Sequence, residues 1–258
     1  MVFADGTVWN RATLLTLATA PTSGNDTFYG DYAANTLNGG AGNDTLSGGT
    51  GNDTYLFNAG DGQDTIIDNG ASSGELNTLQ LGAGIVPGGV TVAEANGSDL
   101  VISFTGSTDK ITLRSQLLSA SGGVDQIVFA DGTVWNRAAL LALATAPTSG
   151  SDTFHGDYAA NTLSGSAGDD TLNGGAGDDI LSGGTGNDTT IGGAGNDTYL
   201  FNRGDGRDTI LDNDTGSSGE VNTLQLGSGI AISDVIVTAA NGGSDLVLSI
   251  AGSTDAAS

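Results

Sequence analysis

Residues 39–56 read GGAGNDTLSGGTGNDTYL, which is one nine-residue unit written twice. The common form is G-G-x-G-(N/D)-D-T-U-x, where U is an apolar residue. The glycines permit a positive φ and hence a tight turn, and the last three residues form a short strand with one inward apolar side chain. Because so short a strand cannot stand alone, the repeat predicts a solenoid whose coils stack around a thin continuous core.

The nine-residue unit extends outward in both directions. Units begin at Pro21 and run to residue 56, and a further unit occupies 59–67 after two extra residues. A second set runs over 147–200 and 203–211, again with two extra residues between. Val2–Asn38 and Val128–Ser164 align without gaps and differ at five of 37 positions. The chain is therefore a tandem repeat built from smaller repeats.

Composition excludes several classes of protein. The chain has 6 Lys+Arg against 30 Asp+Glu, a net charge of −24, with 44 Gly, no Cys and one His. Such a charge argues against binding nucleic acid or an anionic bilayer, and no apolar run approaches the ~20 residues of a membrane-spanning helix. The absence of Cys excludes thiol chemistry and Cys-rich zinc sites. With a single His, neither a His-based triad nor a multi-His metal centre is expected. A hard cation is the partner that this composition favours.

The repeats resemble the RTX family (repeats-in-toxin, haemolysin-type calcium-binding nonapeptide repeats) over residues 21–67 and 147–211. The resemblance implies an all-β fold of parallel β-roll solenoids with two nonapeptides per coil. It also implies several Ca²⁺ ions in the turns, held by the sixth-position Asp and by backbone carbonyls. Asp53 and Asp197 occupy matching positions, and the second set reaches this position after 18 more residues than the first set does. Eighteen residues make one whole coil, so the insertion lengthens the roll and leaves each later turn at the same edge.

The sixth-position side chains are the expected metal ligands, because Ca²⁺ takes six to eight oxygens from carboxylates, carbonyls and water. In isolated turns they would be read only as turn formers, but stacked rows about 5 Å apart repel unless a cation lies between them. The first set gives Asp26, Asn35, Asp44, Asp53 and Asp64; the second gives Asp152, Asn161, Asp170, Asp179, Asp188, Asp197 and Asp208. The turn residues expected beside them are Gly40, Gly42, Asn43, Gly49, Gly51, Asn52, Gly175, Gly177, Asp178, Gly184, Gly186, Asn187, Gly193, Gly195 and Asn196.

Departures from the repeat weaken particular positions. Asn35 and Asn161 offer a neutral oxygen, so sites that include them should be weaker. The two extra residues before 59 and 203 make Asp64 and Asp208 weaker candidates. Thr190 stands where an apolar residue belongs and Ile191 follows it, which predicts a shifted strand there.

The segments outside the repeats alternate polar and apolar residues, and Gly-rich turns separate them. Strands are expected at 78–81, 90–92, 99–104 and 110–113, a hairpin over 126–135 with an Asp-Gly turn, and a short helix from Asn136 to Ala146 before Pro147. The leucines of such helices are expected to cap the open ends of the rolls: Leu14, Leu15 and Leu17 the first, and Leu140, Leu141 and Leu143 the second. This part resembles the flanking region of RTX repeats. The predicted domains are 1–20, 21–67, 68–146, 147–211 and 212–258.

No catalytic constellation is found, so the chain is expected not to be an enzyme. His155 matches Tyr29 in the other copy, which indicates a surface or stacking residue. Glu75 and Glu220 each stand alone in a Ser/Gly-rich loop, whereas a glycosidase needs two facing carboxylates. The Gly runs lack the Lys of a phosphate-binding loop.

The expected function is a secreted module that folds on binding extracellular Ca²⁺. The resemblance implies bacterial type I secretion and an extracellular or cell-surface location. Three roles remain open: a structural repeat of a surface protein, adhesin, surface layer or filament; the export and folding module of a secreted enzyme or toxin; and a carbohydrate- or ice-binding repeat. Expected partners are calcium ions and other copies of the chain, end to end or side by side, with no nucleic acid and no membrane insertion. Both ends look cut from a longer array.

Overall fold

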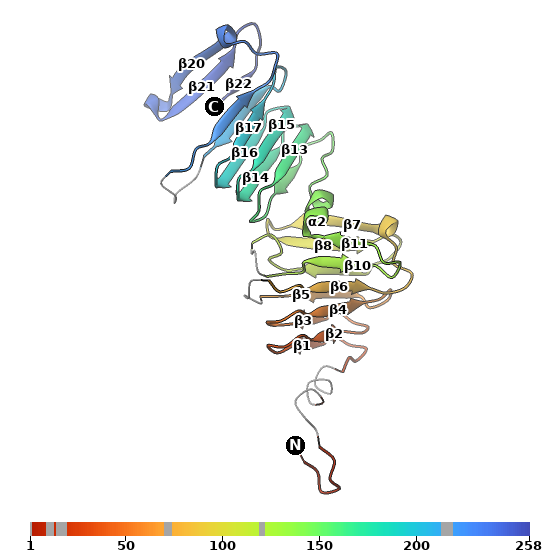
Figure 1. Ribbon diagram of the computed structural model, residues 1–258. Helices are drawn as coiled ribbons and strands as arrows, with labels where there is room; N and C mark the ends of the chain where they lie inside the picture. Colours follow the sequence, from red (N-terminus) through yellow and green to blue (C-terminus); the bar gives the residue numbers. More distant parts are fainter. Residues whose placement is uncertain (1, 9–12, 14–19, 70–73, 119–121, 213–218) are drawn as a thin grey trace. The chain divides into compact units, whose positions relative to one another are not determined.

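The computed structural model describes residues 2–8, 13, 20–69, 74–118, 122–212 and 219–258, and nearly all of them lie in strands and turns. The chain divides into two compact units, residues 1–144 and 145–258 (Figure 1). Each unit contains a roll of nonapeptides that continues into a flanking segment.

In the first unit, alternate nonapeptides enter two different parallel sheets (Figure 1). Phe28 pairs with Leu46 on one sheet, and Leu37 pairs with Tyr55 on the other, so neighbouring coils are two nonapeptides apart. One sheet starts with β1 (Thr27–Tyr29), β3 (Thr45–Ser47) and β5 (Gln63–Ile66), the other with β2 (Thr36–Asn38), β4 (Thr54–Phe57) and β6 (Thr78–Leu81). The predicted parallel β-roll with two nonapeptides per coil is confirmed.

The flanking segment of the first unit continues both sheets of the roll. β9 (Lys110–Leu113) adds in parallel to β5, and β8 (Asp99–Phe104) and β7 (Val90–Ala95) follow it antiparallel; β7 comes directly after η1 (Pro87–Gly89). On the other sheet β10 (Gln126–Val128) adds in parallel to β6, which itself pairs with β4. The roll and its flanking segment therefore share one continuous apolar core.

The expected hairpin and helix close the first unit. β10 pairs antiparallel with β11 (Val134–Asn136), and the Thr133 amide donates to the Asp131 side chain in the turn. The helix α2 (Arg137–Ala144) begins where the Ala139 amide donates to Asn136 Oδ1.

The predicted role of this helix is wrong. It contacts β7 and β11, and Leu140 and Leu141 are buried in the core of the first unit rather than capping the second roll. Leu143 is exposed. The equivalent Leu14, Leu15 and Leu17 lie outside the described residues.

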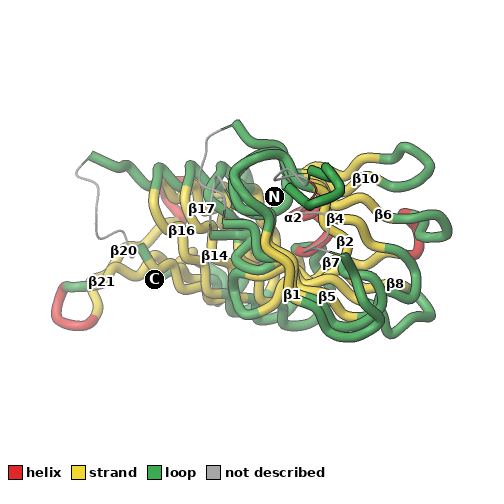
Figure 2. The backbone as a smooth tube through the Cα atoms, turned by 90° about the horizontal axis from the view of Figure 1, so that it is seen from below, coloured by secondary structure: helices red, strands yellow, loops and turns green. Residues whose placement is uncertain are grey.

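The second unit repeats this plan with a longer roll. Its first sheet has the order β12 (Thr153–His155), β14 (Thr171–Ala176), β16 (Thr189–Ala194), β18 (Arg207–Leu211), β22 (Ala256–Ala257), β21 (Asp245–Ile250) and β20 (Val235–Ala240). The second sheet has the order β13 (Thr162–Ala167), β15 (Ile180–Thr185), β17 (Thr198–Phe201) and β19 (Thr223–Leu226). The 3₁₀ turns η2 (Ile232–Asp234) and η3 (Asn241–Gly243) flank β20. Figure 2 shows the short yellow strands of both units joined by green turns.

Most roll strands contribute one inward apolar side chain, and the last strands of the nonapeptide pattern contribute two, such as Tyr55 and Phe57 of β4. The core of a roll is therefore one side chain deep on each sheet. On one sheet of the second unit these are Phe154, Leu172 and Ile210. Between Leu172 and Ile210 stands Thr190, which is 5% exposed. Its strand is not shifted as predicted, because Thr190 pairs with Leu172 in the register of the neighbouring coils. The turn and the parallel ladder fix the register even where the inward residue is polar.

Candidate metal centre

The sixth-position side chains lie in two rows at the edges of each roll. All eight expected aspartates of the inner coils are buried: Asp44, Asp53, Asp64, Asp170, Asp179, Asp188, Asp197 and Asp208. Those of the first coils are half-buried: Asp26, Asn35, Asp152 and Asn161. Rows of buried carboxylates are costly unless something positive balances them.

One oxygen of each inner aspartate accepts a hydrogen bond from the coil before it. The Asp26 amide donates to Asp44 Oδ1 (2.7 Å), and the Asp44 amide donates to Asp64 Oδ1 (3.0 Å). On the opposite edge the Asn35 amide donates to Asp53 Oδ1 (2.7 Å). The second roll repeats the pattern along the rows Asp152–Asp170–Asp188–Asp208 and Asn161–Asp179–Asp197. We call this series of bonds the sixth-position ladder; it places side by side the residues that the sequence pairs.

Asp64 and Asp208 occupy the same ladder position as the other aspartates, despite the two extra residues before each. The extra residues are taken up in a local turn, where the Asn58 amide donates to Asp61 Oδ2 (2.7 Å). The equivalent turn in the second roll joins the Asn202 amide to Asp205 Oδ2 (2.6 Å). The insertion therefore leaves the edge of the roll intact.

The second oxygen of the inner aspartates supports cation binding. Oδ2 of Asp44, Asp53, Asp64, Asp170, Asp179 and Asp188 is buried and has no hydrogen-bond partner. In all of these except Asp64, whose turn has Ala59 at the first position, this oxygen lies against the first glycine of its own turn: a Cβ on Gly48 would fall 2.1 Å from Asp53 Oδ2, and one on Gly183 2.2 Å from Asp188 Oδ2. A buried, unpaired carboxylate oxygen in a space that only glycine leaves open suits a hard cation.

The other expected turn residues shape the turn. The ten second- and fourth-position glycines all have positive φ, for example 145° at Gly42 and 99° at Gly184. The fifth-position side chains are exposed and bond neighbouring coils: Asn52 Oδ1 accepts the Leu76 amide (2.9 Å), and Asp178 Oδ1 accepts the Asn196 amide (2.8 Å). Asn43 accepts in the same way, and the Asn187 amide donates to Asp169.

Burial, above all, raises the pKa of six inner aspartates, and neighbouring carboxylates add to it: Asp44, Asp53, Asp64, Asp179, Asp188 and Asp208. The pKa of Asp53 rises to about 6, and that of Asp64, Asp179 and Asp208 to about 7. The hydrogen bond that each carboxylate accepts from a backbone amide of the preceding coil lowers its pKa and so opposes this rise. Near neutral pH a roll without cations thus holds acids that resist ionisation, which a bound cation would relieve.

The first coils differ from the inner ones. The oxygen of Asn35 accepts the Asp31 amide, and that of Asn161 accepts the Asp157 amide, both at 2.7 Å. Asp26 Oδ2 likewise accepts the Thr22 amide (2.7 Å). These bonds close the start of each roll.

Sequence reasoning missed two sixth-position residues. Asn77 Oδ1 accepts the Asp53 amide (2.9 Å), and Asn222 Oδ1 accepts the Asp197 amide (2.7 Å), so both continue the sixth-position ladder. The signal was present, because Asn77-Thr-Leu repeats Asn35-Thr-Leu. The first-position glycines, such as Gly48 and Gly183, were also missed.

No three His, Cys, Asp or Glu side chains of the described ranges gather into a metal-binding group. A Ca²⁺ ion in these turns would therefore draw most of its oxygens from backbone carbonyls and water. In the part of the chain that the structure describes, no helix is long and apolar enough to cross a membrane.

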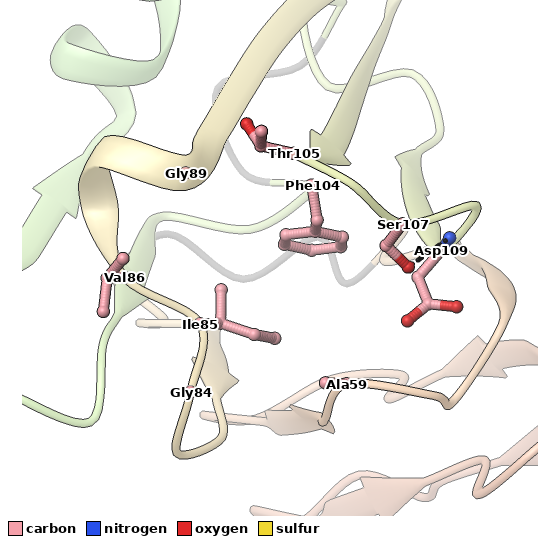
Figure 3. A pocket seen from close by; sticks show the side chains of 9 residues that line it. All are labelled: Ala59, Gly84, Ile85, Val86, Gly89, Phe104, Thr105, Ser107 and Asp109. Atoms are coloured by element: carbon pink, nitrogen blue, oxygen red, sulfur yellow. Dashed lines mark hydrogen bonds between the residues drawn. The ribbon is translucent and has the colours of Figure 1, made fainter.

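A separate small cavity of about 210 Å³ lies in the first flanking segment (Figure 3). Ile85, Val86 and Phe104 line it with Asp109, its only titratable lining residue. Asp109 Oδ2 accepts the Gly60 amide (2.7 Å), and Phe104 stacks on Phe57. With one engaged carboxylate, the cavity offers no acid–base pair.

Comparison with known sequence families agrees with the turns described above. The RTX calcium-binding nonapeptide repeat matches residues 22–55, 148–181, 165–199 and 174–210. The haemolysin-type calcium binding protein related domain matches residues 99–139, within the first flanking segment. The chain therefore carries RTX calcium-binding repeats with a related haemolysin-type domain between its two rolls.

Among solved structures, the chain is similar to the extracellular lipase LipA from Serratia marcescens. The identity is 22%, the match covers 90% of this chain and 37% of the lipase, and the TM-score is 0.33. It is also similar to the AlgE6R3 subunit of the mannuronan C5-epimerase from Azotobacter vinelandii, at 26% identity over 42% of this chain and 70% of that one, with a TM-score of 0.31. The chain spans 37% of the length of the lipase.

Proposed function

We propose that the chain is a secreted, non-catalytic module that folds when its rolls bind extracellular Ca²⁺, and that it serves as a structural repeat of a large surface protein. The observation that carries the calcium-dependent folding is the set of buried Oδ2 atoms without partners, which except in Asp64 lie against a first-position glycine.

Calcium binding and folding are coupled in this proposal. The core of a roll is one side chain deep, so apolar burial offsets little of the chain entropy. The aspartate rows oppose folding until a cation balances them. Because the ligands converge only in the folded roll, the free energy of binding becomes free energy of folding. Calcium supply then decides where the chain folds.

The role as a structural repeat is supported by two matching surfaces. The Phe3 amide donates to Thr7 O (2.8 Å), as the Phe129 amide donates to Thr133 O (2.9 Å), so the segment 2–8 forms the hairpin that its near-identical copy forms at 128–134. In the first unit the strand that enters this hairpin, β10, pairs with β6.

The strand β19 has the sequence of β6, Thr-Leu-Gln-Leu, and pairs with β17. Among the described residues no strand lies on its other side. A strand equivalent to β10 from a second copy, in which Val2 is the counterpart of Val128, would fit there as β10 fits on β6. End-to-end addition of copies would reproduce a contact that the chain already makes internally.

A binding role for carbohydrate or ice is not proposed. It requires a flat exposed row of threonines, whereas Thr45, Thr54, Thr171, Thr189 and Thr198 are half-buried within their strands.

Far-UV circular dichroism during a calcium titration tests the proposal, with magnesium at equal ionic strength as the control and light scattering at saturation. We expect a transition from coil to β with Ca²⁺ alone, followed by scattering that grows with protein concentration. A spectrum that is already β-rich in chelator and unmoved by calcium would contradict calcium-driven folding. A calcium transition without growth of scattering would contradict the assembly role alone.

A further inference from the structure

The turn that leads into β6 departs from the nonapeptide, and the second unit has the same departure before β19. Leu76 donates its amide to Asn52, as a fifth-position residue does, and Asn77 accepts from Asp53, as a sixth-position residue does. Glu75 therefore stands at the fourth position, where the preceding turn has Gly51. In the second unit the Val221 amide donates to Asn196 Oδ1 (2.9 Å), which places Glu220 at the same position.

The Glu75 carboxylate replaces a backbone carbonyl. In the regular turns a fourth-position amide donates to the third-position carbonyl of the next coil: Gly42 to Asp61 O (2.9 Å), and Gly186 to Asp205 O (2.7 Å). The Gly51 amide donates instead to Glu75 Oε1 (2.8 Å). The second carboxylate oxygen, Oε2, is buried without a hydrogen-bond partner in both Glu75 and Glu220.

A second carboxylate lies in the same turn. Asp53 is 0% exposed, and its Oδ2 has no partner and lies against Gly48, in the turn whose Gly51 holds Glu75. The neighbouring charges that act on Asp53, those of Asp68, Glu75 and Asp31, are all negative. The turn 48–53 thus holds one buried carboxylate oxygen without a partner, on Asp53, and its Gly51 amide holds the carboxylate that carries another, on Glu75.

We propose that Glu75 and Glu220 each complete a calcium site at the last turn of their roll, where it joins the flanking segment. The sixth-position residue there is a neutral Asn, so the glutamate supplies the charge that aspartate supplies elsewhere. The remaining oxygens come from backbone carbonyls and water, as in the other turns. The inference rests on the proposed calcium binding and extends it to two residues outside the nonapeptides.

The test counts bound ions in the full chain, by equilibrium dialysis against calcium followed by elemental analysis. Glu75→Gln and Glu220→Gln keep the oxygen that accepts the fourth-position amide and remove the charge. We expect each variant to bind one calcium ion fewer than the parent chain, and the double variant two fewer. Glu94→Gln is the matched control, because Glu94 lies on β7 outside the roll turns, and it should leave the count unchanged.

An unchanged count and affinity in both folded variants would overturn the inference and leave Glu75 as an acceptor for the Gly51 amide. A parent chain that binds no calcium would instead overturn the proposed function. If a variant folds poorly, its loss of thermal stability is compared in calcium and in chelator with a stabilising osmolyte. A loss confined to calcium supports the site, and an equal loss in both overturns it.

Discussion

Replacing Asp179 by Asn should change the stability of the second roll in opposite directions with and without calcium. Asp179 is 1% exposed; its Oδ1 accepts the Asn161 amide (2.7 Å) and its Oδ2 has no partner. Asn fits this position, since Asn161 occupies it in the preceding coil and Asn222 occupies it at the end of the same row. The substitution keeps the accepting oxygen and removes only the charge.

The size of each effect follows from the spacing of the coils. Charges on adjacent coils are about 5 Å apart, and at that distance they repel by about 1 to 3 kcal/mol for effective dielectric constants between 80 and 20. Without calcium, the substitution should therefore stabilise the folded roll by about that much. With calcium, one bound ion stabilises the folded roll by about 2.7 kcal/mol when the calcium concentration is 100 times the Kd of the site. Because Asp179 borders the turns of Asn161 and Asp197, two sites weaken, and the net loss in saturating calcium is about 2 to 4 kcal/mol.

Thermal unfolding followed by far-UV circular dichroism measures both effects, in excess calcium and in chelator with trimethylamine N-oxide to populate the fold. In calcium we expect Tm to fall on the order of 10 °C; in chelator it should rise. Asp178→Asn is the control, because that side chain is exposed at the fifth position and keeps its acceptor oxygen. Equal destabilisation by Asp179→Asn in both buffers would refute the reasoning, since the carboxylate would then act as a hydrogen-bond acceptor alone.

Three further predictions concern the same rolls. Gly183→Ala would place a Cβ 2.2 Å from Asp188 Oδ2 and should raise the calcium concentration needed for folding, whereas Gly229→Ala, with nothing within 4 Å, should leave it unchanged. Because folding raises the pKa of Asp64, Asp179 and Asp208 from 3.8 to about 7, the folded chelated roll binds more protons than the coil, so its stability should fall as pH rises from about 4 to 7. A chelated roll that loses stability on acidification from pH 7 to 5 would contradict this pH dependence. Protons also compete with calcium for the carboxylates, so the calcium concentration at the midpoint of folding should be higher at pH 6 than at pH 8. Leu181→Ala should cost about 2 to 5 kcal/mol in calcium by urea unfolding, because Leu181 is 0% exposed, while Leu246→Ala, at a side chain 66% exposed, should cost far less.

The coil geometry was predictable from the sequence because it is local. The spacing of glycine, aspartate and one apolar residue repeats every nine positions, and it specifies the turn, the strand and the inward side chain together. The attachment of the flanking segment is not local. Apart from the short Asn-Thr-Leu that begins at Asn77, nothing in this segment indicates that Thr78–Leu81 pairs in parallel with β4. An apolar helix face such as Leu140 and Leu141 fits any open core within reach of the chain.

The sixth-position row was predictable for the same reason, since Asp53 and Asp179 recur at fixed spacing. What the sequence could not give was the surroundings of each carboxylate. That Gly48 leaves room for Asp53 Oδ2, or that Glu75 folds back onto Gly51, depends on contacts between coils. Thr190 shows the converse: a local departure from the pattern was overridden by pairing with the strands on either side.

The sixth-position ladder gives the roll a direction. Each of its amides finds its acceptor on the coil that follows it in the sequence. The Asp197 amide depends on Asn222 and the Asp53 amide on Asn77, whose own amide donates to Asp125 Oδ2 (2.6 Å). At the start, Asp26 and Asp152 only offer side chains that water or a nearby threonine can satisfy. A buried amide without an acceptor costs about 1 to 3 kcal/mol. A roll can therefore be shortened or extended at its beginning with little penalty, while its end is the position that must be sealed, and assembly that starts from the sealed end satisfies every coil as it is laid down.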